Sequence, residues 1–483
     1  MNDAQNTPRR VAVIGGGISG LAAAHRLVEL DPTCEVRLFE AGSRLGGVIS
    51  TVHEDGFQVE QSADNFITTF PWGLDLCERL GLTDQLVQTN PAHRQTYVVH
   101  NGKLYKLPDG FLMMAPTRMW PLAVTPVLSP LGKLRAAMEY FIPPHMDEAD
   151  ESMASFVCRR LGREAFDRLV EPLVGAVYAA DMNKLSVNAT LPRFRQMERE
   201  HGSLIKAMRK NMKAQSKGKG SKGKGPKAKA ESGARYSMFV TLREGLTCLI
   251  DAMAARLPEA AVQLNSPVER IERSENGWLV SAKGVEDPTP FDGLIIATPS
   301  GTSARLLSPI DADLGNDLGS ICHSGTAIVS LGYDRDQVGH SLDGMGAVVP
   351  KIENSPILAC SFSSQKYTHR APEGKVLLRV FVGGANREEM AEMPDEQLRP
   401  LVTKHLEGLL KVRGEPCYCN IAHWPGTMPQ YHVGHKELVA RIFAGVEKID
   451  GVELAGNAFR GVGLPDCIHG GETAAERVLG QAD

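Results

Sequence analysis

The chain has 483 residues, of which 42% are hydrophobic, and this is enough for a large core and more than one domain. Its formal net charge of −4 gives no general attraction to nucleic acid, so no nucleic-acid partner is expected. The nine cysteines lie singly apart from Cys417 and Cys419, which indicates reduced thiols in a cytoplasmic protein and neither a disulfide framework nor a metal site.

The polar N-terminus leads directly into a predicted strand, so we expect no signal peptide. Residues 9–50 carry the strongest motif, VAVIGGGISGLAAAHRL, in which Gly15, Gly17 and Gly20 form the pattern GxGxxG. Gly15 would make a tight turn after a buried strand, Gly17 would admit a pyrophosphate, and Gly20 would allow close packing of the following helix. The N-terminus of that helix would stabilise the phosphates. The residues predicted to surround the pyrophosphate are Gly15, Gly16, Gly17, Ile18, Ser19 and Gly20.

The next predicted strand, VRLFE, ends at Glu40, and an acid there hydrogen-bonds ribose hydroxyl groups and disfavours a 2′-phosphate. The run AGSRLGGVIS follows and places Arg44 before Gly46 and Gly47, which extends the phosphate cradle. This run resembles the FAD signature of amine oxidases and their relatives. FAD is therefore the predicted cofactor, and the residues expected to hold it in this part of the chain are Glu40, Ala41, Arg44, Gly46, Gly47 and Val48.

Further along the chain, residues 74–88 have apolar side chains near a helical period, which predicts a helix. The most apolar stretch, 111–131, is interrupted by Arg118 and four prolines, so we expect no membrane-spanning helix. Its apolar side chains would pack in the core, line a pocket or dip into a bilayer surface, and the sequence leaves these three alternatives open. They are Met113, Met114, Met119, Trp120, Leu122 and Val124.

Residues 151–180 form the clearest helical region, punctuated by Gly162 and Pro172. A lysine- and glycine-rich stretch follows, which holds ten Lys or Arg and no acid between 206 and 230. It cannot bury apolar surface, so a disordered loop is predicted, with a basic arm for anionic lipid or an acidic substrate as the alternative.

The rest of the chain returns to alternating elements. Strands are predicted within 262–300 and 323–383, a helix at 396–411, and a strand, glycine-rich turn and helix at the C-terminal end. The predicted fold is α/β, with a Rossmann-type FAD-binding domain, a mixed-sheet substrate domain and a helical insertion domain. The predicted ranges are 1–90, 236–300 and 420–483 for the FAD-binding domain, 91–110 and 301–419 for the substrate domain, 111–210 for the helical domain, and 211–235 for the disordered loop.

Three later segments resemble parts of the same FAD family. The run 292–299 resembles a strand that returns to the FAD domain, and 265–268 resembles a segment whose valine, here Val268, lies against the adenine. The turn 456–464 resembles the one that approaches the flavin ring, where a helix N-terminus would stabilise negative charge. The residues implied there are Gly456, Val462, Gly463 and Leu464. No second GxGxxG for a nicotinamide cofactor occurs, which favours reduction of the flavin by the substrate and reoxidation by oxygen or another acceptor.

Four blocks resemble the flavin-dependent porphyrinogen oxidases of haem biosynthesis, closest to the soluble bacterial branch. They are LVEPLVGAVYAADMNKLSVNATLPRF (169–194), TLREGLTCLIDAM (241–253), AHWPGTMPQYHVGH (422–435) and GNAFRGVGLPDCIHGGETAA (456–475). The resemblance implies three successive two-electron oxidations of a carboxylate-bearing tetrapyrrole, either coproporphyrinogen or protoporphyrinogen, with O2 reduced to peroxide. Positioning of the macrocycle against the flavin would supply much of the rate.

The resemblance also implies roles for single residues. Trp424 and a segment after Glu60 would contact FAD; this segment reads Gly-Pro-Asp-Ser in the family but is Ser62, Ala63, Asp64 and Asn65 here. Arg94 would pair with a substrate propionate, and Ala176 would stand near the substrate in place of the family's glycine and narrow the pocket slightly. No catalytic base is assigned, because the histidines His323, His423, His432 and His435 have equally good structural explanations, and the flavin performs the chemistry.

Other functions remain open at this point. A flavin amine oxidase would share the FAD motif but would need an aromatic cage, and a carotenoid-type desaturase would need an apolar tunnel. A flavin-bound scaffold without activity is the third alternative. The expected location is the cytoplasm, with peripheral contact at the inner membrane surface as an option, and the sequence does not indicate an oligomeric state.

Overall fold

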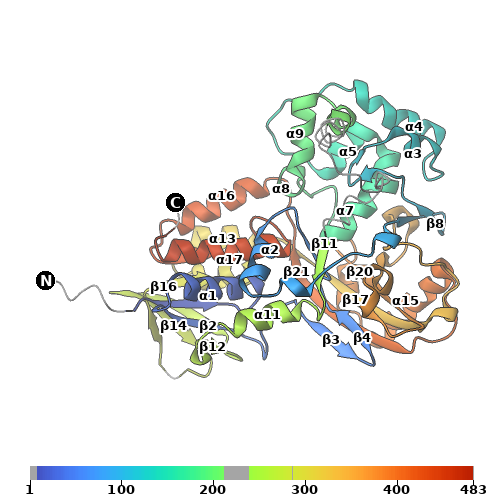
Figure 1. The fold of residues 1–483 in the computed structure, drawn as a ribbon. Helices are drawn as coiled ribbons and strands as arrows, with labels where there is room; N and C mark the ends of the chain where they lie inside the picture. The colour runs from blue at the N-terminus through green and yellow to red at the C-terminus, as the bar shows by residue number, and fades with distance from the viewer. Residues whose placement is uncertain (1–7, 211–238, 286, 482–483) are drawn as a thin grey trace, which may run out of the picture.

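The structure is a computed structural model that describes residues 8–210, 239–285 and 287–481. The loop predicted at 211–235 lies outside these residues. Figure 1 shows a region of sheet and helices beside the N-terminus, a second sheet region, and a mostly helical region that borders the second sheet. The chain passes between these regions several times, and its division into domains stays a prediction.

The first sheet has five parallel strands in the order β12-β2-β1-β16-β22. In its central strand, Val11 and Val13 pack into one core and Ala12 and Ile14 into another. Both faces are therefore covered, which explains why the sequence is apolar at consecutive positions. The strands are β1 (Arg10–Ile14), β2 (Glu35–Phe39), β12 (Val262–Gln263), β16 (Gly293–Ile296) and β22 (Val452–Leu454).

Helices and a small sheet cover the two faces of this parallel sheet. One core contains α1 (Ile18–Leu30), α11 (Thr247–Ala254) and α17 (Leu464–Val478). The other contains side chains of α12 (Ser300–Leu307), α13 (Ala312–Gly319), α16 (His435–Val446) and the antiparallel strands β13 (Val268–Ser274), β14 (Gly277–Ala282) and β15 (Thr289–Phe291). This arrangement confirms the predicted α/β fold with a Rossmann-type parallel sheet.

The second large sheet is mixed and has the order β21-β17-β20-β19-β18-β7-β8. Every neighbouring pair is antiparallel except β18 with β7. Helix α15 (Asp395–Leu410) packs against it, in agreement with the helix predicted at 396–411. The strands are β7 (Thr96–His100), β8 (Lys103–Lys106), β17 (His323–Asp334), β18 (Gly346–Val348), β19 (Ile357–Phe362), β20 (Lys375–Gly383) and β21 (Tyr418–Pro429).

The third region is mostly helical, and its core also includes Val98, Val348 and Ala359 of the mixed sheet. Gly162, with φ +89°, separates two of its helices at the position where the sequence indicated a break. A π-helical turn, η5 (Phe166–Val170), follows. The α-helices are α3 (Met119–Val124), α4 (Pro130–Ala137), α5 (Met153–Leu161), α6 (Arg163–Ala165), α7 (Glu171–Tyr178), α8 (Val187–Thr190) and α9 (Pro192–His201).

The helix predicted at 74–88 is confirmed over its first part only, and its continuation to 88 is wrong. Helix α2 (Trp72–Arg79) ends just before Gly81, whose φ of +75° is left-handed, and the 3-10 turn η2 (Thr83–Gln85) follows. The chain then enters strand β6 (Leu86–Gln88), which pairs with the distant β11 (Phe239–Leu242) and through it with β5 (Phe66–Ile67). Pairing with a segment far along the chain therefore overrides the local helical pattern.

Short elements complete the described chain. Most of them have no separate signal in the sequence. The strands are β3 (Thr51–Glu54), β4 (Phe57–Glu60), β9 (Phe111–Leu112) and β10 (Ala115–Pro116); the helical turns are η3 (Pro91–His93), η4 (Met138–Phe141), η6 (Glu259–Ala261), η7 (Arg335–Gln337), η8 (Lys351–Glu353), α14 (Ser363–Lys366), η9 (Thr368–Arg370) and η10 (Glu388–Ala391).

The apolar stretch 111–131 divides between two environments. Met113, Met114 and Leu122 are buried in the core of the helical region, whereas Trp120 is 76% exposed and Val124 is 56% exposed. Within the described ranges, no helix is long and apolar enough to cross a membrane.

Candidate active site

The glycine turn after β1 has the geometry that the motif predicts. Gly15 has φ +107°, its N–H donates to the Phe39 carbonyl at 2.8 Å, and a Cβ there would lie 2.6 Å from the Ala297 carbonyl oxygen. A Cβ on Gly20 would collide with the Gly15 carbonyl oxygen, so helix and strand pack as closely as backbone allows. A Cβ on Gly17 would meet no described atom within 4 Å, which leaves space for a phosphate at the N-terminus of α1.

Glu40 directly follows β2 and organises the same turn. Its Oε2 accepts the N–H of Gly16 at 2.7 Å, and its Oε1 accepts the N–H of Gly42 at 2.6 Å. A carboxylate has about four lone-pair sites, so two amide bonds leave capacity for ribose hydroxyl groups. The predicted ribose contact therefore fits, and Glu40 also shapes the turn, which the sequence did not indicate.

Arg44 stabilises the turn that follows it through hydrogen bonds to backbone carbonyls. Its guanidinium donates to the carbonyls of Leu45 at 3.0 Å, Gly47 at 2.7 Å and Ile49 at 3.0 Å. Gly46 and Gly47 both have positive φ, and the Gly46 N–H donates to the Gly16 carbonyl at 2.8 Å. This brings the second glycine turn against the first, as the predicted cradle requires.

Segment 62–65 lies between the parallel-sheet region and the mixed sheet. Neither Ser62 nor Ala63 has a positive φ, so their side chains do not strain the backbone where the family has glycine and proline. The Trp424 indole N–H, from β21, donates to the Gln61 carbonyl at 2.6 Å, so Trp424 lies against this segment. Ala63 packs at the edge of the same core as Ile18 and Val48, which places the segment near the glycine turns.

A cluster of five charged side chains surrounds this segment, and we name it the five-charge cluster: Glu60, Asp64, Lys366, Arg370 and Arg379. Sequence patterns did not indicate this cluster, although Arg379 is the one charged residue inside the apolar run VLLRVFVGG and was a possible signal. Glu60, Arg370 and Arg379 are fully buried. Lys366 pairs with Asp64 at 3.1 Å, Arg379 pairs with Asp64 at 3.5 Å, and Arg370 pairs with Glu60 at 3.3 Å.

Burial and pairing shift the ionisation of the cluster in opposite directions. Burial raises the pKa of Glu60 despite nearby Arg370, and burial lowers the pKa of Lys366 despite its pairing with Asp64. For Asp64, burial acts to raise the pKa, but Lys366, Arg379 and Arg370 together hold it at about 2. Asp64 is therefore a permanent anion at neutral pH.

The turn after β22 places Gly456, φ +136°, next to the Thr298 carbonyl, and the Tyr431 hydroxyl donates to the Asn457 carbonyl at 2.6 Å. Gly463 is the N-cap of α17, as predicted. However, Asp466 lies in the first turn of that helix and packs against Gly461 and Gly463. The helix end therefore faces its own carboxyl group, whose pKa is raised by burial, and this weakens the predicted stabilisation of negative charge.

The remaining predicted contacts lie in three places. Ala41 is exposed beside Glu40, and Val268 begins β13 with its carbonyl accepting from Arg305 at 3.0 Å. Arg94, half-buried, ends the turn η3. Ala176, on α7, packs against the same apolar core as Val462 and Phe381.

Three of the four histidines considered as bases have structural partners. His423 lies between the Ala391 carbonyl at 2.8 Å and Asp395 at 2.6 Å, and His435 stacks on Tyr431 with ring centroids 4.0 Å apart. His323 contacts the Ile321 carbonyl at 3.0 Å. Burial lowers the pKa of His432 and no hydrogen bond directs it toward the site. Among the described residues, no group of three or more His, Cys, Asp or Glu could hold a metal ion.

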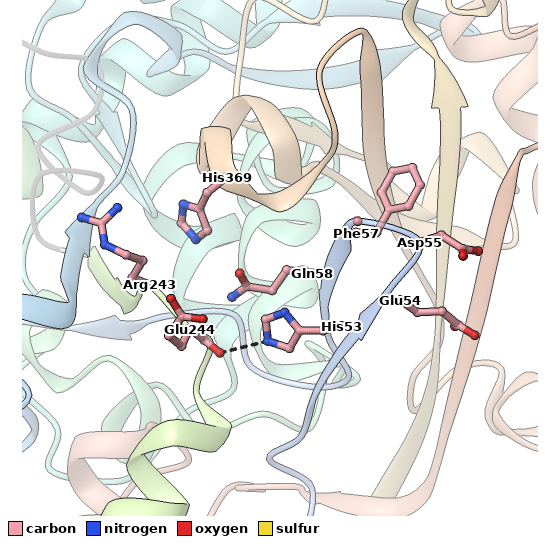
Figure 2. A pocket seen from close by; sticks show the side chains of 9 residues that line it. His53, Glu54, Asp55, Phe57, Gln58, Arg243, Glu244 and His369 are labelled. Atoms are coloured by element: carbon pink, nitrogen blue, oxygen red, sulfur yellow. Dashed lines mark hydrogen bonds between the residues drawn. The ribbon is translucent and has the colours of Figure 1, made fainter.

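A separate pocket of about 490 Å³ lies beside the five-charge cluster (Figure 2). His53, Gln58 and His369 converge on it, whereas Glu54 and Asp55 point away. None of the predicted cofactor or substrate residues lines this pocket.

Comparison with known proteins identifies the family. A family model described as flavin containing amine oxidoreductase matches residues 18–479. The chain belongs to this family. Membership confirms the predictions of an oxidoreductase and of FAD as its cofactor, and the two glycine turns, the free position at Gly17 and Glu40 fit that group.

The relatives span the whole chain. Coproporphyrinogen III oxidase of Bacillus subtilis is 34% identical, with 98% of each chain covered. Coproporphyrinogen III oxidase of Propionibacterium freudenreichii is 35% identical over 98% of this chain and 91% of its own. The chloroplastic protoporphyrinogen oxidase of Nicotiana tabacum is 30% identical over 97% of this chain and 85% of its own. These matches bear out the resemblance to porphyrinogen oxidases.

Solved structures are also similar to this chain over its whole length. A crystal structure of an Exiguobacterium protein, named as a candidate protoporphyrinogen oxidase, has a TM-score of 0.86 at 30% identity and covers 98% of this chain and 100% of its own. Putrescine oxidase has a TM-score of 0.68 at 16% identity, with 98% of this chain and 99% of its own covered, and this likeness concerns the fold alone.

Proposed function

We propose that the chain is an FAD-dependent oxidase that converts a porphyrinogen to the porphyrin in haem biosynthesis, with O2 as electron acceptor. The observation that carries this is the full-length similarity to enzymes of that name, combined with a nucleotide-binding turn that fits FAD. Relatives named coproporphyrinogen III oxidase reach 34–35% identity and the protoporphyrinogen oxidase of tobacco chloroplasts 30%, which favours coproporphyrinogen III over protoporphyrinogen IX.

The chain's own residues would bind and orient. FAD, when bound, accepts the two electrons of each oxidation step. The glycine turn at Gly17 and the N-terminus of α1 would hold the pyrophosphate, and Glu40 the ribose. The proposed contacts are Gly15, Gly16, Gly17, Ile18, Ser19, Gly20, Glu40, Ala41, Arg44, Gly46, Gly47, Val48, Ser62, Ala63, Asp64, Asn65, Val268, Trp424, Gly456, Val462, Gly463 and Leu464.

The substrate would lie between the flavin turn and the helical region, with Arg94 at one carboxylate and Ala176 near the macrocycle. Arginine suits a propionate because its planar guanidinium can donate two parallel hydrogen bonds. His323, His423 and His435 have structural partners, and so positioning of the substrate against FAD, without a protein base, would carry the reaction.

The direct test uses purified protein supplied with FAD. We expect a flavin absorption band, and fluorescent porphyrin formed under air from coproporphyrinogen III, more slowly from protoporphyrinogen IX. Bleaching of the flavin by amines or polyenes with both porphyrinogens inert would indicate an amine oxidase or a desaturase instead. No bleaching by any donor would indicate a scaffold.

Gly17 offers a variant specific to cofactor binding. Its φ of −69° and ψ of 176° are open to alanine, and the added methyl group meets no described atom within 4 Å. Gly17→Ala should therefore keep the melting temperature of the FAD-free protein but raise the dissociation constant of FAD at least about tenfold. Gly20→Ala is the contrast, because its Cβ would collide with the Gly15 carbonyl and destabilise the fold itself.

Arg94→Ala tests the substrate contact. We expect KM for a porphyrinogen to rise on the order of tenfold or more, since a partly buried ionic contact contributes ~1.5–3 kcal/mol. The FAD dissociation constant should stay unchanged. An unaltered KM removes Arg94 from the substrate site.

We further propose a cytoplasmic location with peripheral membrane contact through α3, α4 and η4. Trp120, Leu131, Leu134 and Phe141 are 76%, 78%, 61% and 81% exposed there, a concentration of apolar surface that favours a membrane interface. Co-sedimentation with vesicles of anionic lipid should fall for Trp120→Ser combined with Phe141→Ser. Ile352→Ser, which alters an exposed apolar residue on η8, is the matched control, and equal sedimentation of all three proteins would contradict the contact.

A further inference from the structure

The five-charge cluster carries an excess of positive charge. Three cations, Lys366, Arg370 and Arg379, face two anions, Glu60 and Asp64. Transfer of a proton from Lys366 to Glu60 would leave the net charge of the cluster unchanged. The side chains come from β4, the loop after it, α14, η9 and β20, so the fold brings this charge together from distant parts of the chain.

The cluster also has donors left over. In Arg370, Nε and Nη1 are buried without a hydrogen-bond partner in the part of the chain that the structure describes, and so are Nε of Arg379 and the Ser62 hydroxyl. Nη1 of Arg379 makes no hydrogen bond there either, but it lies 3.5 Å from Asp64 as its ion-pair partner. Buried polar groups are normally hydrogen-bonded, because leaving one unsatisfied costs roughly 1–3 kcal/mol. An uncompensated buried charge with free donors indicates that a negatively charged or electron-rich group completes the site.

The excess charge lies at the segment predicted to contact FAD. Arg379 Nη2 donates to the Ser62 carbonyl at 2.6 Å, and Arg370 Nη2 donates to the Asp64 carbonyl at 3.2 Å. The Arg379 guanidinium also lies over the Phe381 ring, 5.3 Å from its centroid. Phe381 packs against the same apolar core as Ala176 and Val462, the predicted substrate and flavin-turn residues. Trp424, a predicted FAD contact, donates to the Gln61 carbonyl at 2.6 Å beside the same segment, so the cluster borders the predicted FAD site.

We propose that the five-charge cluster sets the reduction potential of the bound flavin, by compensating the negative charge that the flavin gains when it is reduced. The inference rests on the proposed function. Loss of a hydride from a porphyrinogen carbon would break one C–H bond and pass one proton and two electrons to FAD, so that the cofactor would gain one negative charge. The substrate would be left with one positive charge and would release a proton to solvent. A net positive charge in a buried site favours that product electrostatically. Lys366, Arg370 and Arg379 are positioning residues in this scheme.

The test measures the midpoint potential of FAD in the holoenzyme, together with the dissociation constant of the flavin–sulfite adduct, which also places negative charge on the ring. In Lys366→Met, we expect sulfite binding to weaken at least tenfold and the potential to fall by at least about 30 mV, the two-electron equivalent of tenfold. Lys366→Arg keeps the charge and should retain both values. Asp64→Asn removes an anion and should move both in the opposite direction.

Lys375→Met is the matched control. It removes a cation from the same strand as Arg379, but Lys375 is paired with Asp334 at the strand's end and lies outside the cluster. It should leave both values unchanged.

Unchanged potentials in Lys366→Met, Arg379→Met and Asp64→Asn, with porphyrinogen oxidised, would overturn this inference alone. Should Lys366→Met fail to fold, the opposite shift in Asp64→Asn still decides the matter. Failure of the unmodified protein to take up FAD would overturn the proposed function together with the inference.

Discussion

Two buried charge clusters in this molecule differ in the balance between positive and negative side chains. The helical cluster, in the third region, contains three cations and three anions: Glu139, Glu151, Arg159, Arg160, Arg195 and Glu198. The five-charge cluster has one cation more than it has anions. Both are buried in an apolar environment, where charge is tolerated only when it is paired and hydrogen-bonded.

The helical cluster is nearly complete within the protein. Arg160 donates from Nε to Glu139 at 2.9 Å and from Nη1 to the carbonyls of Ile142 and Pro143 at 3.0 and 3.2 Å. Its Nη2 also donates to the carbonyl of Gly202 at 3.0 Å. In this cluster, only Nε of Arg159 and of Arg195 lack a hydrogen-bond partner among the residues described.

In the five-charge cluster, four guanidinium nitrogens lack such a partner within the same described ranges. A balanced cluster with satisfied donors joins elements of the fold, whereas an unbalanced one with free donors is suited to a ligand. Burial of charge therefore does not by itself indicate a functional site. Charge balance and hydrogen-bond satisfaction distinguish the two cases here.

The largest effect should follow from breaking the helical cluster. Arg160→Met leaves Glu139 fully buried without its ion-pair partner, and such losses cost about 3–5 kcal/mol. Urea denaturation should show the free energy of unfolding reduced by this amount, while the flavin potential of any folded protein stays unchanged. Adding Glu139→Gln removes the stranded charge and should restore part of the loss. A stability equal to that of the unmodified protein would mean that the pair is dispensable.

The second largest effect should be a loss of stability in acid, caused by groups in and beside the five-charge cluster. Burial, with Arg370 and Arg243 nearby, lowers the pKa of His369 to about 4, below its ordinary 6.5. The unfolded chain thus binds a proton at His369 before the folded protein does, so stability falls as pH falls from about 6.5 to 4. The stability that ionised Asp64 contributes, with its pKa of about 2, is lost at still lower pH, between about 4 and 2.

The measurement is the urea midpoint at pH 7, 5 and 4. His369→Gln should have a smaller loss between pH 7 and 4 than the unmodified protein, because it removes the group that titrates in that window. His53→Gln, an exposed histidine in the same pocket (Figure 2), is the control and should follow the unmodified protein. Identical pH profiles for all three proteins would contradict the assignment.

The sequence predicts the nucleotide-binding half of the site well because its rules are local. The Gly15, Gly17 and Gly20 spacing, the apolar strand before it and the acid at Glu40 each follow from backbone geometry within about fifty residues, and the structure has them as expected. The five-charge cluster could not be predicted, since Asp64 meets Lys366 and Arg379 only through the pairing of elements far apart in the chain. The same cause explains the failure at 74–88, where pairing with β11 converts a helical pattern into strand β6.

The smallest effect on stability should come from the residue with the largest proposed effect on the flavin. Burial lowers the pKa of Lys366, so the cost of burying its ammonium offsets much of its attraction to Asp64. Lys366→Met fills a similar volume and leaves Asp64 beside Arg379 at 3.5 Å. We therefore expect the free energy of unfolding to change by about 1 kcal/mol or less, well below the loss in Arg160→Met. A loss as large as that of Arg160→Met would show that the five-charge cluster, like the helical one, holds the fold together, and the distinction between the two clusters would fail.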